Sequence, residues 1–307
     1  MPQIAYLGPS GTFTEQASRA LTTGFDAELV PYDTVPQALA AVRAGEVVAA
    51  GVPVENSVEG SVPVTLDALV ADEPLIAVAE TIIPITFDVL VRPGTTAADV
   101  RTVASHPHAI AQVRGWLAEN LPGARVELAA STAAAAAEVE AGQHDAAVSA
   151  PIAVEHYRSL ERLATGVADI GDAITRFLLV RKPSPLPEPT GADRTSVAAV
   201  IAHEVGSLTD VLAELSLRGI NLTRIESRPI KDRIGEYRFY LDFDGHVADA
   251  RIGDALAALR RRCSEVRFLG SYPKADHTPS TVRPSASEQA FRASEQWLSE
   301  IRAGRLA

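Results

Sequence analysis

The chain has 307 residues, of which 47% are hydrophobic, and its formal net charge is −11. This size and composition suit two or three modest hydrophobic cores, and the acidic balance argues against a nucleic-acid partner. No apolar run approaches the ~20 residues that cross a bilayer, so no membrane partner is expected, and the start Met-Pro-Gln-Ile lacks the features of a signal peptide. Cys263 is the single cysteine; without an intrachain disulfide, a reducing cytoplasmic location is expected.

The first glycine-rich turn follows a short apolar strand at residues 4–7. It reads Gly8-Pro-Ser-Gly11 and continues into Thr12-Phe-Thr-Glu15, where Thr12 and Glu15 have capping-box spacing. A strand, a glycine turn and a helix start together form a concavity of backbone N–H groups suited to a carboxylate or phosphate. A plain turn from strand to helix explains the same pattern equally well.

A second polar turn follows another strand. The pattern predicts a strand at 27–32, a helix at 35–44, a strand at 47–54 and a helix at 64–71. Asn56 and Ser57 then lie at the carboxyl end of a strand and before a helix, where open α/β sheets bind ligands. Both residue types are also common in turns, so a plain loop is the alternative.

Residues 75–92 form one long β-like segment that could carry the chain from one lobe to another. Beyond it the alternation restarts, with strands at 100–104, 125–129 and 145–150, helices at 108–120 and 132–141, and returning strands at 163–170 and 174–181. Ser105 and His106 occupy the first loop of this part. We therefore predict two lobes, about 1–76 with 170–181 and about 77–169, and a cleft between them.

Thr175-Arg176-Phe177 interrupts the last of these strands with a polar pair. A hydroxyl donor and a fixed cation could face the cleft there; an edge strand with a solvated Arg is the alternative. Residues 182–193 follow as a proline-rich spacer, since alternate prolines remove backbone donors and favour an extended chain.

The segment 194–272 shows a compact pattern of strand, helix, two strands, helix and strand, which is the ferredoxin-like order. Gly206-Ser207-Leu208 begins its first helix and could receive a carboxylate, while Glu226-Ser227-Arg228 places charges at a strand end. A tail at 273–307 ends in a helix at 287–301. The seven histidines form no grouping with metal-ligand spacing, so no metal is expected.

Six motifs in order carry a family resemblance. They are Gly8-Pro-Ser-Gly-Thr-Phe-Thr14, Pro53-Val-Glu-Asn-Ser57 with Gly60, Ser105-His-Pro107 with Gln112, Thr175-Arg-Phe177, Gly206-Ser-Leu208 and Glu226-Ser-Arg-Pro229. The first four resemble the successive motifs of the prephenate dehydratase family, and the last two resemble the phenylalanine-binding signatures of its ACT regulatory domain. The resemblance covers about residues 1–272.

The resemblance implies an α/β fold with a two-lobe, periplasmic-binding-protein-like catalytic domain at 1–181 and an ACT domain at 194–272. The implied reaction is the decarboxylating dehydration of prephenate to phenylpyruvate in phenylalanine biosynthesis, with no cofactor. The implied catalytic residues are Thr175, Arg176, Asn56 and Ser57, and the implied substrate-binding residues are Gly11, Thr12, Ser105, His106 and Phe177. Thr175 would donate to the leaving hydroxyl, with His106 as a reserve general acid. Arg176 would clamp a carboxylate or, equally well, pair within the fold.

Phenylalanine is the implied effector, and a homodimer or homotetramer through the ACT domains is the implied assembly. The implied effector-binding residues are Gly206, Ser207, Leu208, Asn221, Leu222, Glu226, Ser227 and Arg228. Two other functions fit the same features: the same chemistry on arogenate, and a two-lobe protein that binds a small anion without chemistry.

Overall fold

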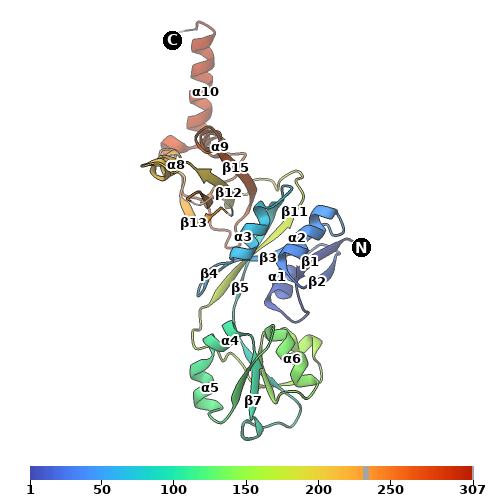
Figure 1. Ribbon diagram of the computed structural model, residues 1–307. Coiled ribbons are helices and arrows are strands. Elements are labelled where there is room, and N and C mark those ends of the chain that lie inside the picture. Colours follow the sequence, from blue (N-terminus) through green and yellow to red (C-terminus); the bar gives the residue numbers. More distant parts are fainter. Residues whose placement is uncertain (231–234, 306–307) are drawn as a thin grey trace. The chain divides into compact units, whose positions relative to one another are not determined.

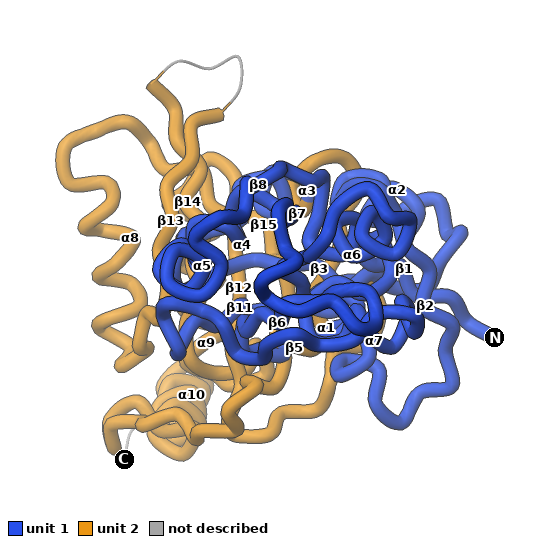
Figure 2. The backbone as a smooth tube through the Cα atoms, turned by 90° about the horizontal axis from the view of Figure 1, so that it is seen from below, with its two compact units in different colours: residues 1–68, 81–180 blue, residues 69–80, 181–307 orange. Residues whose placement is uncertain are grey.

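The computed structural model describes residues 1–230 and 235–305 (Figure 1). The chain forms two compact units, residues 1–68 with 81–180 and residues 69–80 with 181–307 (Figure 2). The boundary at 180 lies one residue from the predicted end of the first domain. Residues 69–80, which the prediction divided between the first lobe (to about 76) and the second lobe (from about 77), belong to the second unit.

The first unit contains two sheets. In one of them β1 (Gln3–Leu7) lies between β2 (Glu28–Tyr32) and β3 (Ala49–Asn56), parallel to both, and β11 (Ile174–Arg181) runs antiparallel to β3. The short β4 (Gly60–Ser61) pairs with the end of β3. The associated helices are α1 (Phe13–Leu21), α2 (Val35–Ala44) and α3 (Pro63–Val70). Six of the eight residues of β11 are buried in succession, as expected for a strand covered on both faces.

The second sheet of this unit has the strand order β10-β6-β9-β7-β8. Its strands are β6 (Asp88–Val91), β7 (Thr102–Ser105), β8 (Arg125–Leu128), β9 (Ala146–Ser149) and β10 (Glu161–Ala164). Its helices are η1 (Ala97–Asp99), α4 (Pro107–Gln112), α5 (Arg114–Asn120), α6 (Thr132–Glu140) and α7 (Ala153–His156). A core of Val89, Val103, Val148 and neighbouring apolar side chains stabilises the sheet.

The second unit has the element order β12 (Asp193–Ile201), α8 (Ser207–Ser216), β13 (Leu222–Pro229), β14 (Tyr237–Asp244), α9 (Ala250–Arg262) and β15 (Glu265–Pro273). The strands are antiparallel in the order β13-β14-β12-β15. This is the ferredoxin-like arrangement, so the predicted fold class is confirmed. The tail adds η2 (Pro284–Ala286) and α10 (Glu288–Arg302).

The strand β5 (Ile76–Pro84) begins in the second unit, where Ala77 pairs with Gly270 of β15. Gly270 has a φ of +138°, and a Cβ atom built there would lie 2.2 Å from the Ala77 carbonyl oxygen. Only glycine fits this close approach of two backbones.

Three predicted elements differ from the structure. The single long strand at 75–92 is two strands, β5 and β6, because the chain between them turns away and Ile85 N–H donates to the Ala173 carbonyl. The single helix at 108–120 is divided at Val113, whose φ of −127° interrupts it between α4 and α5. The strand predicted at 163–170 is shorter and ends at Ala164. Within the described ranges, no helix has the length and apolar character to cross a membrane.

Candidate active site

A cavity of about 370 Å³ lies within the first unit, and residues from both of its sheets line it. The carboxyl ends of β1, β3, β7 and β8 all lead into it, as open α/β sheets place their ligand sites. Its lining consists of Leu7, Gly8, Thr12, Phe13, Thr14, Asp33, Asn56, Glu59, Val62, Ile85, Phe87, His106, His108, Ala109, Gln112, Ala130, Ser131, Thr132, Thr175 and Phe177. The predicted cleft residues Thr12, Asn56, His106, Thr175 and Phe177 therefore share one cavity.

Asn56 and Thr175 form the hydrogen-bonded pair at this cavity. Asn56 Nδ2 donates to Thr175 Oγ1 over 2.7 Å, while Asn56 Oδ1 accepts the backbone N–H groups of Val58 and Glu59. The two backbone donors fix which end of the amide is oxygen, and hence that nitrogen faces Thr175. Since Thr175 accepts from Asn56, its own O–H hydrogen is available to donate into the cavity.

Two helix N-termini face the same cavity. Thr12 caps α1, its side chain accepting the N–H of Glu15, and Ser131 caps α6, accepting the N–H of Ala134. The first backbone N–H groups of a helix lack partners within the helix, and the helix dipole favours an anion there. Ser131 and Thr132 were not predicted as site residues, although a serine between a strand and an alanine-rich helix has the same position as the polar turn at Asn56.

His106 lines the cavity at the start of α4, where its Nδ1 accepts the N–H of His108 over 3.3 Å. Burial and the neighbouring His108 lower the pKa of His106, and Glu59 opposes them. His108 Nδ1 lies 2.5 Å from a carboxylate oxygen of Glu59. His106 is therefore biased toward its neutral form. Because its Nδ1 accepts from His108, the hydrogen of the neutral ring lies on Nε2, which is a hydrogen-bond donor.

Arg176 does not line the cavity. Successive side chains of a strand point to opposite faces, so Arg176 lies on the other side of β11 from Thr175 and Phe177, which both face the cavity. Its Nε lies 3.2 Å from a carboxylate oxygen of Glu55, and the residue is only 7% exposed. This geometry favours the second of the two roles considered for Arg176, a pair within the fold.

Three other predicted site residues lie beside the cavity and are absent from its lining. Ser105 is fully buried and donates from Oγ to the carbonyl of Val148 over 2.6 Å. Ser57 is exposed, and its Oγ accepts the N–H of Ile174. Gly11 has a φ of +89° and directly precedes Thr12 in the chain. All three shape the walls, and their direct contact with substrate stays a prediction.

The buried carboxylate of Glu15 stabilises the turn at Gly11. Glu15 is 3% exposed and accepts the N–H of Gly11 over 2.7 Å. His156, from α7, lies 2.9 Å from a Glu15 carboxylate oxygen, and Arg19 lies 2.5 Å from the other. A Cβ on Gly11 would lie 3.1 Å from the backbone of Ala153, so the turn packs directly on α7. This cluster was not predicted from the sequence.

The charge of the cavity is unusual for an anion site. Asp33 and Glu59 are acidic, and none of the described residues that line it is Lys or Arg. In the described part of the chain, no group of three or more His, Cys, Asp or Glu side chains is arranged to hold a metal ion. Any anion bound here would therefore meet backbone N–H groups, amides, hydroxyls and the imidazoles of His106 and His108.

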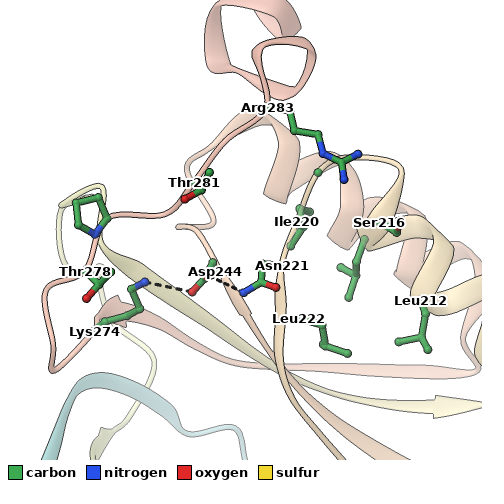
Figure 3. A pocket seen from close by; sticks show the side chains of 13 residues that line it. Leu212, Ser216, Ile220, Asn221, Leu222, Asp244, Lys274, Thr278, Thr281 and Arg283 are labelled. Atoms are coloured by element: carbon green, nitrogen blue, oxygen red, sulfur yellow. Dashed lines mark hydrogen bonds and ion pairs between the residues drawn. The ribbon is translucent and has the colours of Figure 1, made fainter.

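The predicted effector residues of the second unit divide between two cavities. Asn221 and Leu222 line a cavity of about 750 Å³ (Figure 3), and Leu208 lines another of about 140 Å³. Gly206 caps α8 with a φ of 87°. Glu226, Ser227 and Arg228 lie on β13 outside both linings.

The fold and the site together define a class: an α/β protein with a polar, anion-suited cavity between two sheets, joined in one chain to a ferredoxin-like unit. A family model described as prephenate dehydratase matches residues 4–185. The chain belongs to the prephenate dehydratase family.

Three relatives are similar over nearly the whole chain. A prephenate dehydratase of Amycolatopsis methanolica is 59% identical over 308 residues, covering 100% of both chains. A crystal structure of prephenate dehydratase from Arthrobacter aurescens in complex with L-Phe has a TM-score of 0.92 and 43% identity, covering 98% of this chain and 99% of that one. A structure described as GqqA, a novel type of quorum quenching acylase, has a TM-score of 0.80 and 31% identity, covering 88% and 97%.

Proposed function

We propose that this protein is a prephenate dehydratase, a carbon–oxygen hydro-lyase that converts prephenate to phenylpyruvate in phenylalanine biosynthesis. The observation that carries the proposal is that the Asn56–Thr175 pair opens into the same cavity as the N-termini of α1 and α6. Prephenate bears two carboxylates and a ring hydroxyl. A site for it needs two anion-binding regions and a donor aimed at the hydroxyl, and this cavity has groups of both kinds.

The two carboxylates are assigned to the helix N-termini. The N–H groups after Thr12 belong to α1, beside the first sheet, and those after Ser131 belong to α6, beside the second sheet. They can therefore bind the two carboxylates at opposite ends of a dianion. Fixed backbone dipoles need no reorganisation during the reaction, which is the property that stabilises developing charge most effectively. Phe177 and Phe87 supply apolar walls for the ring.

In the chemical step, the bond to the ring carboxylate breaks, CO2 leaves, and the bonding electrons move into the ring as hydroxide departs from the opposite carbon. The departing hydroxide needs a hydrogen-bond donor or a proton. Thr175 supplies the donor through its free O–H hydrogen, with the proton relayed through water, because a threonine hydroxyl is a poor acid by itself. Asn56 holds Thr175 in place, and Arg176, paired with Glu55, orders the strand behind it.

The Thr175→Ala variant tests this assignment. Losing one well-placed donor lowers kcat on the order of 10²–10³-fold, whereas Thr175→Ser keeps the hydroxyl and should retain most activity. Turnover is read as phenylpyruvate absorbance after incubation with prephenate, with arogenate assayed beside it. An acylated substrate is assayed as a third arm because of the similarity to GqqA. Wild-type protein that leaves prephenate unchanged would refute the proposal.

Phenylalanine is the proposed effector of the second unit. A ferredoxin-like unit follows the catalytic unit, and the similar Arthrobacter aurescens protein was crystallised with L-Phe. The predicted site combines the α8 start at Gly206-Ser207-Leu208 with Asn221 and Leu222. Because Leu208 lines a different cavity of the chain from Asn221 and Leu222, a site that combines them is proposed to form between two copies, as in the predicted homodimer or homotetramer. Assembly through the ACT domains, and a cytoplasmic location, stay predictions.

A further inference from the structure

The tail of the second unit ends in a helix that has little contact with the rest of that unit. α10 is attached at its start, where the N–H of Ala250 donates to Glu288 over 2.9 Å and Phe291 is half-buried. Beyond that point it projects away from α9 (Figure 1), and every residue of 292–299 is exposed. An isolated helix of about 12–15 residues is marginal in water, because most helical stability comes from packing of an apolar face. α10 has 15 residues and lacks that packing within the described part of its unit.

The exposed part of α10 carries a continuous apolar face. Trp297, Leu298 and Ile301 are 61%, 40% and 36% exposed. At about 3.6 residues per turn these three side chains fall within a sector about 100° wide. Phe291 precedes Leu298 by two helical turns and extends the same face toward the start of the helix. Scattered exposed apolar side chains are ordinary, whereas adjoining ones mark a contact surface.

One border of this face carries charges of both signs. Glu288, Glu295 and Arg302 follow one another at the heptad interval, which aligns them along one side of the helix. Among the described residues, Glu295 and Arg302 take part in no ion pair. The border therefore favours a partner that presents opposite charges in the reverse order.

A second copy of the same helix meets that requirement when it runs antiparallel. A two-fold axis between Leu298 and Ser299 has Glu295 as far before it as Arg302 lies after it. Glu295 of each copy then lies opposite Arg302 of the other, and the two apolar faces meet at the axis. In a parallel pair the same two residues are separated by about 10 Å along the helix, so the ion pairs do not form.

We propose that α10 is a self-association surface, which pairs with α10 of a second copy in antiparallel orientation and sets Glu295 of each chain against Arg302 of the other. The contact strip is about 22 Å long and about 10 Å wide, so it buries far less than the roughly 1,200 Å² of a stable interface. The helix pair is therefore weak by itself and adds to other contacts between copies, such as the predicted contact between ACT domains. The proposal concerns the tail alone and does not rest on the catalytic assignment.

The fluorescence of Trp297 tests the proposal in the full-length protein. Trp116→Phe leaves Trp297 as the one tryptophan, and it keeps an aromatic ring at the core of the second sheet, where Trp116 packs. Emission and iodide quenching are measured from about 1 μM to about 1 mM protein at low ionic strength, because small interfaces associate weakly and salt screens charges. With rising concentration the emission should shift to shorter wavelength and quenching should fall, while sedimentation equilibrium records the mass.

Reversal of single charges then identifies the partner and its direction. Glu295→Arg and Arg302→Glu each turn two ion pairs into two like-charge contacts, so the midpoint concentration should rise about 10-fold in either variant. The double variant should recover the original midpoint, and so should an equimolar mixture of the two single variants, in which opposite charges meet again at both contacts. Arg292→Glu is the matched control, since Arg292 pairs with Glu288 and points away from the apolar face, and its midpoint should not change.

The same Trp297 emission in wild-type protein and both single variants at every concentration would overturn the proposal. Burial of Trp297 at the mass of one chain would overturn it as well, because α10 would then pack on its own chain. Failure of the mixture and of the double variant to recover would refute the antiparallel arrangement, whereas recovery excludes unfolding as the cause of the single-variant effect.

Discussion

The cluster of Glu15, Arg19 and His156 beside the Gly11 turn gives a prediction about residues that position the active site without taking part in the reaction. In His156→Leu, the Glu15 carboxylate loses one of its three donors and stays 3% exposed. A buried acceptor that loses a partner costs about 1–3 kcal/mol, and the lower half of this range applies because Gly11 and Arg19 still donate. For a unit of this size, 1 kcal/mol lowers Tm by about 2–4 °C.

The position of the cluster adds a kinetic expectation. Because Glu15 holds Gly11, and Gly11 leads directly into the cap at Thr12, loosening the turn should weaken substrate binding. We expect KM for prephenate to rise several-fold in His156→Leu, with kcat changing less, since the Asn56–Thr175 pair lies on other elements. His156→Gln, which can still donate to Glu15, should restore most of the lost affinity.

The assays are thermal unfolding and steady-state kinetics, with His144→Leu as control. His144 lies 3.5 Å from Glu138, with both side chains partly exposed at 22% and 31%, and such pairs contribute only about 0–1 kcal/mol. If His156→Leu matched His144→Leu in both Tm and KM, the supporting role of the buried carboxylate would be refuted.

Three further predictions concern pH and packing. The lowered pKa of His106 means that the unfolded chain binds a proton at this residue more readily than the folded chain, so stability should fall as pH drops from about 6.5 toward the folded pKa. In His106→Asn, the Tm should depend less on pH in that window; a dependence of Tm on pH equal to that of the wild type would contradict the shift. Gly270→Ala should lower the stability of the second unit by several kcal/mol because its Cβ has no room, while Gly253→Ala in α9, where the nearest atom is 3.7 Å away, should leave stability equal or higher. Ser105→Ala should cost about 1–3 kcal/mol by leaving a buried carbonyl without its donor, with kcat unchanged at temperatures where the variant is folded; a large loss of kcat there would show that Ser105 meets the substrate.

Local patterns predicted the features that depend on neighbouring residues. The spacing of Thr12 and Glu15 gave the start of α1, because a cap bond spans three residues. The polar turn after β3 gave Asn56, because parallel strands bring their carboxyl ends to one edge. Strand alternation could also have indicated that Thr175 and Arg176 face opposite sides.

Contacts between distant segments were beyond such patterns. His156 meets Glu15 across 141 positions of sequence, and no periodicity connects them. Val113 interrupts a helix that its flanking residues favour, because the surrounding chain overrides local preference there. The tail gave no signal that Thr278, Thr281 and Arg283 line a cavity of the second unit, since that cavity is shared with residues of α8 and β13 that are distant in sequence.

The uncharged donors of the catalytic cavity bear on how the enzyme completes a cycle. Once CO2 has left, phenylpyruvate carries one carboxylate, so in the proposed assignment one of the two helix N-termini no longer has an anion to bind. No lysine or arginine among the described lining residues is present to retain the remaining one. The dianionic substrate would thus bind at two helix N-termini and the monoanionic product at only one. This difference favours rapid release of the product.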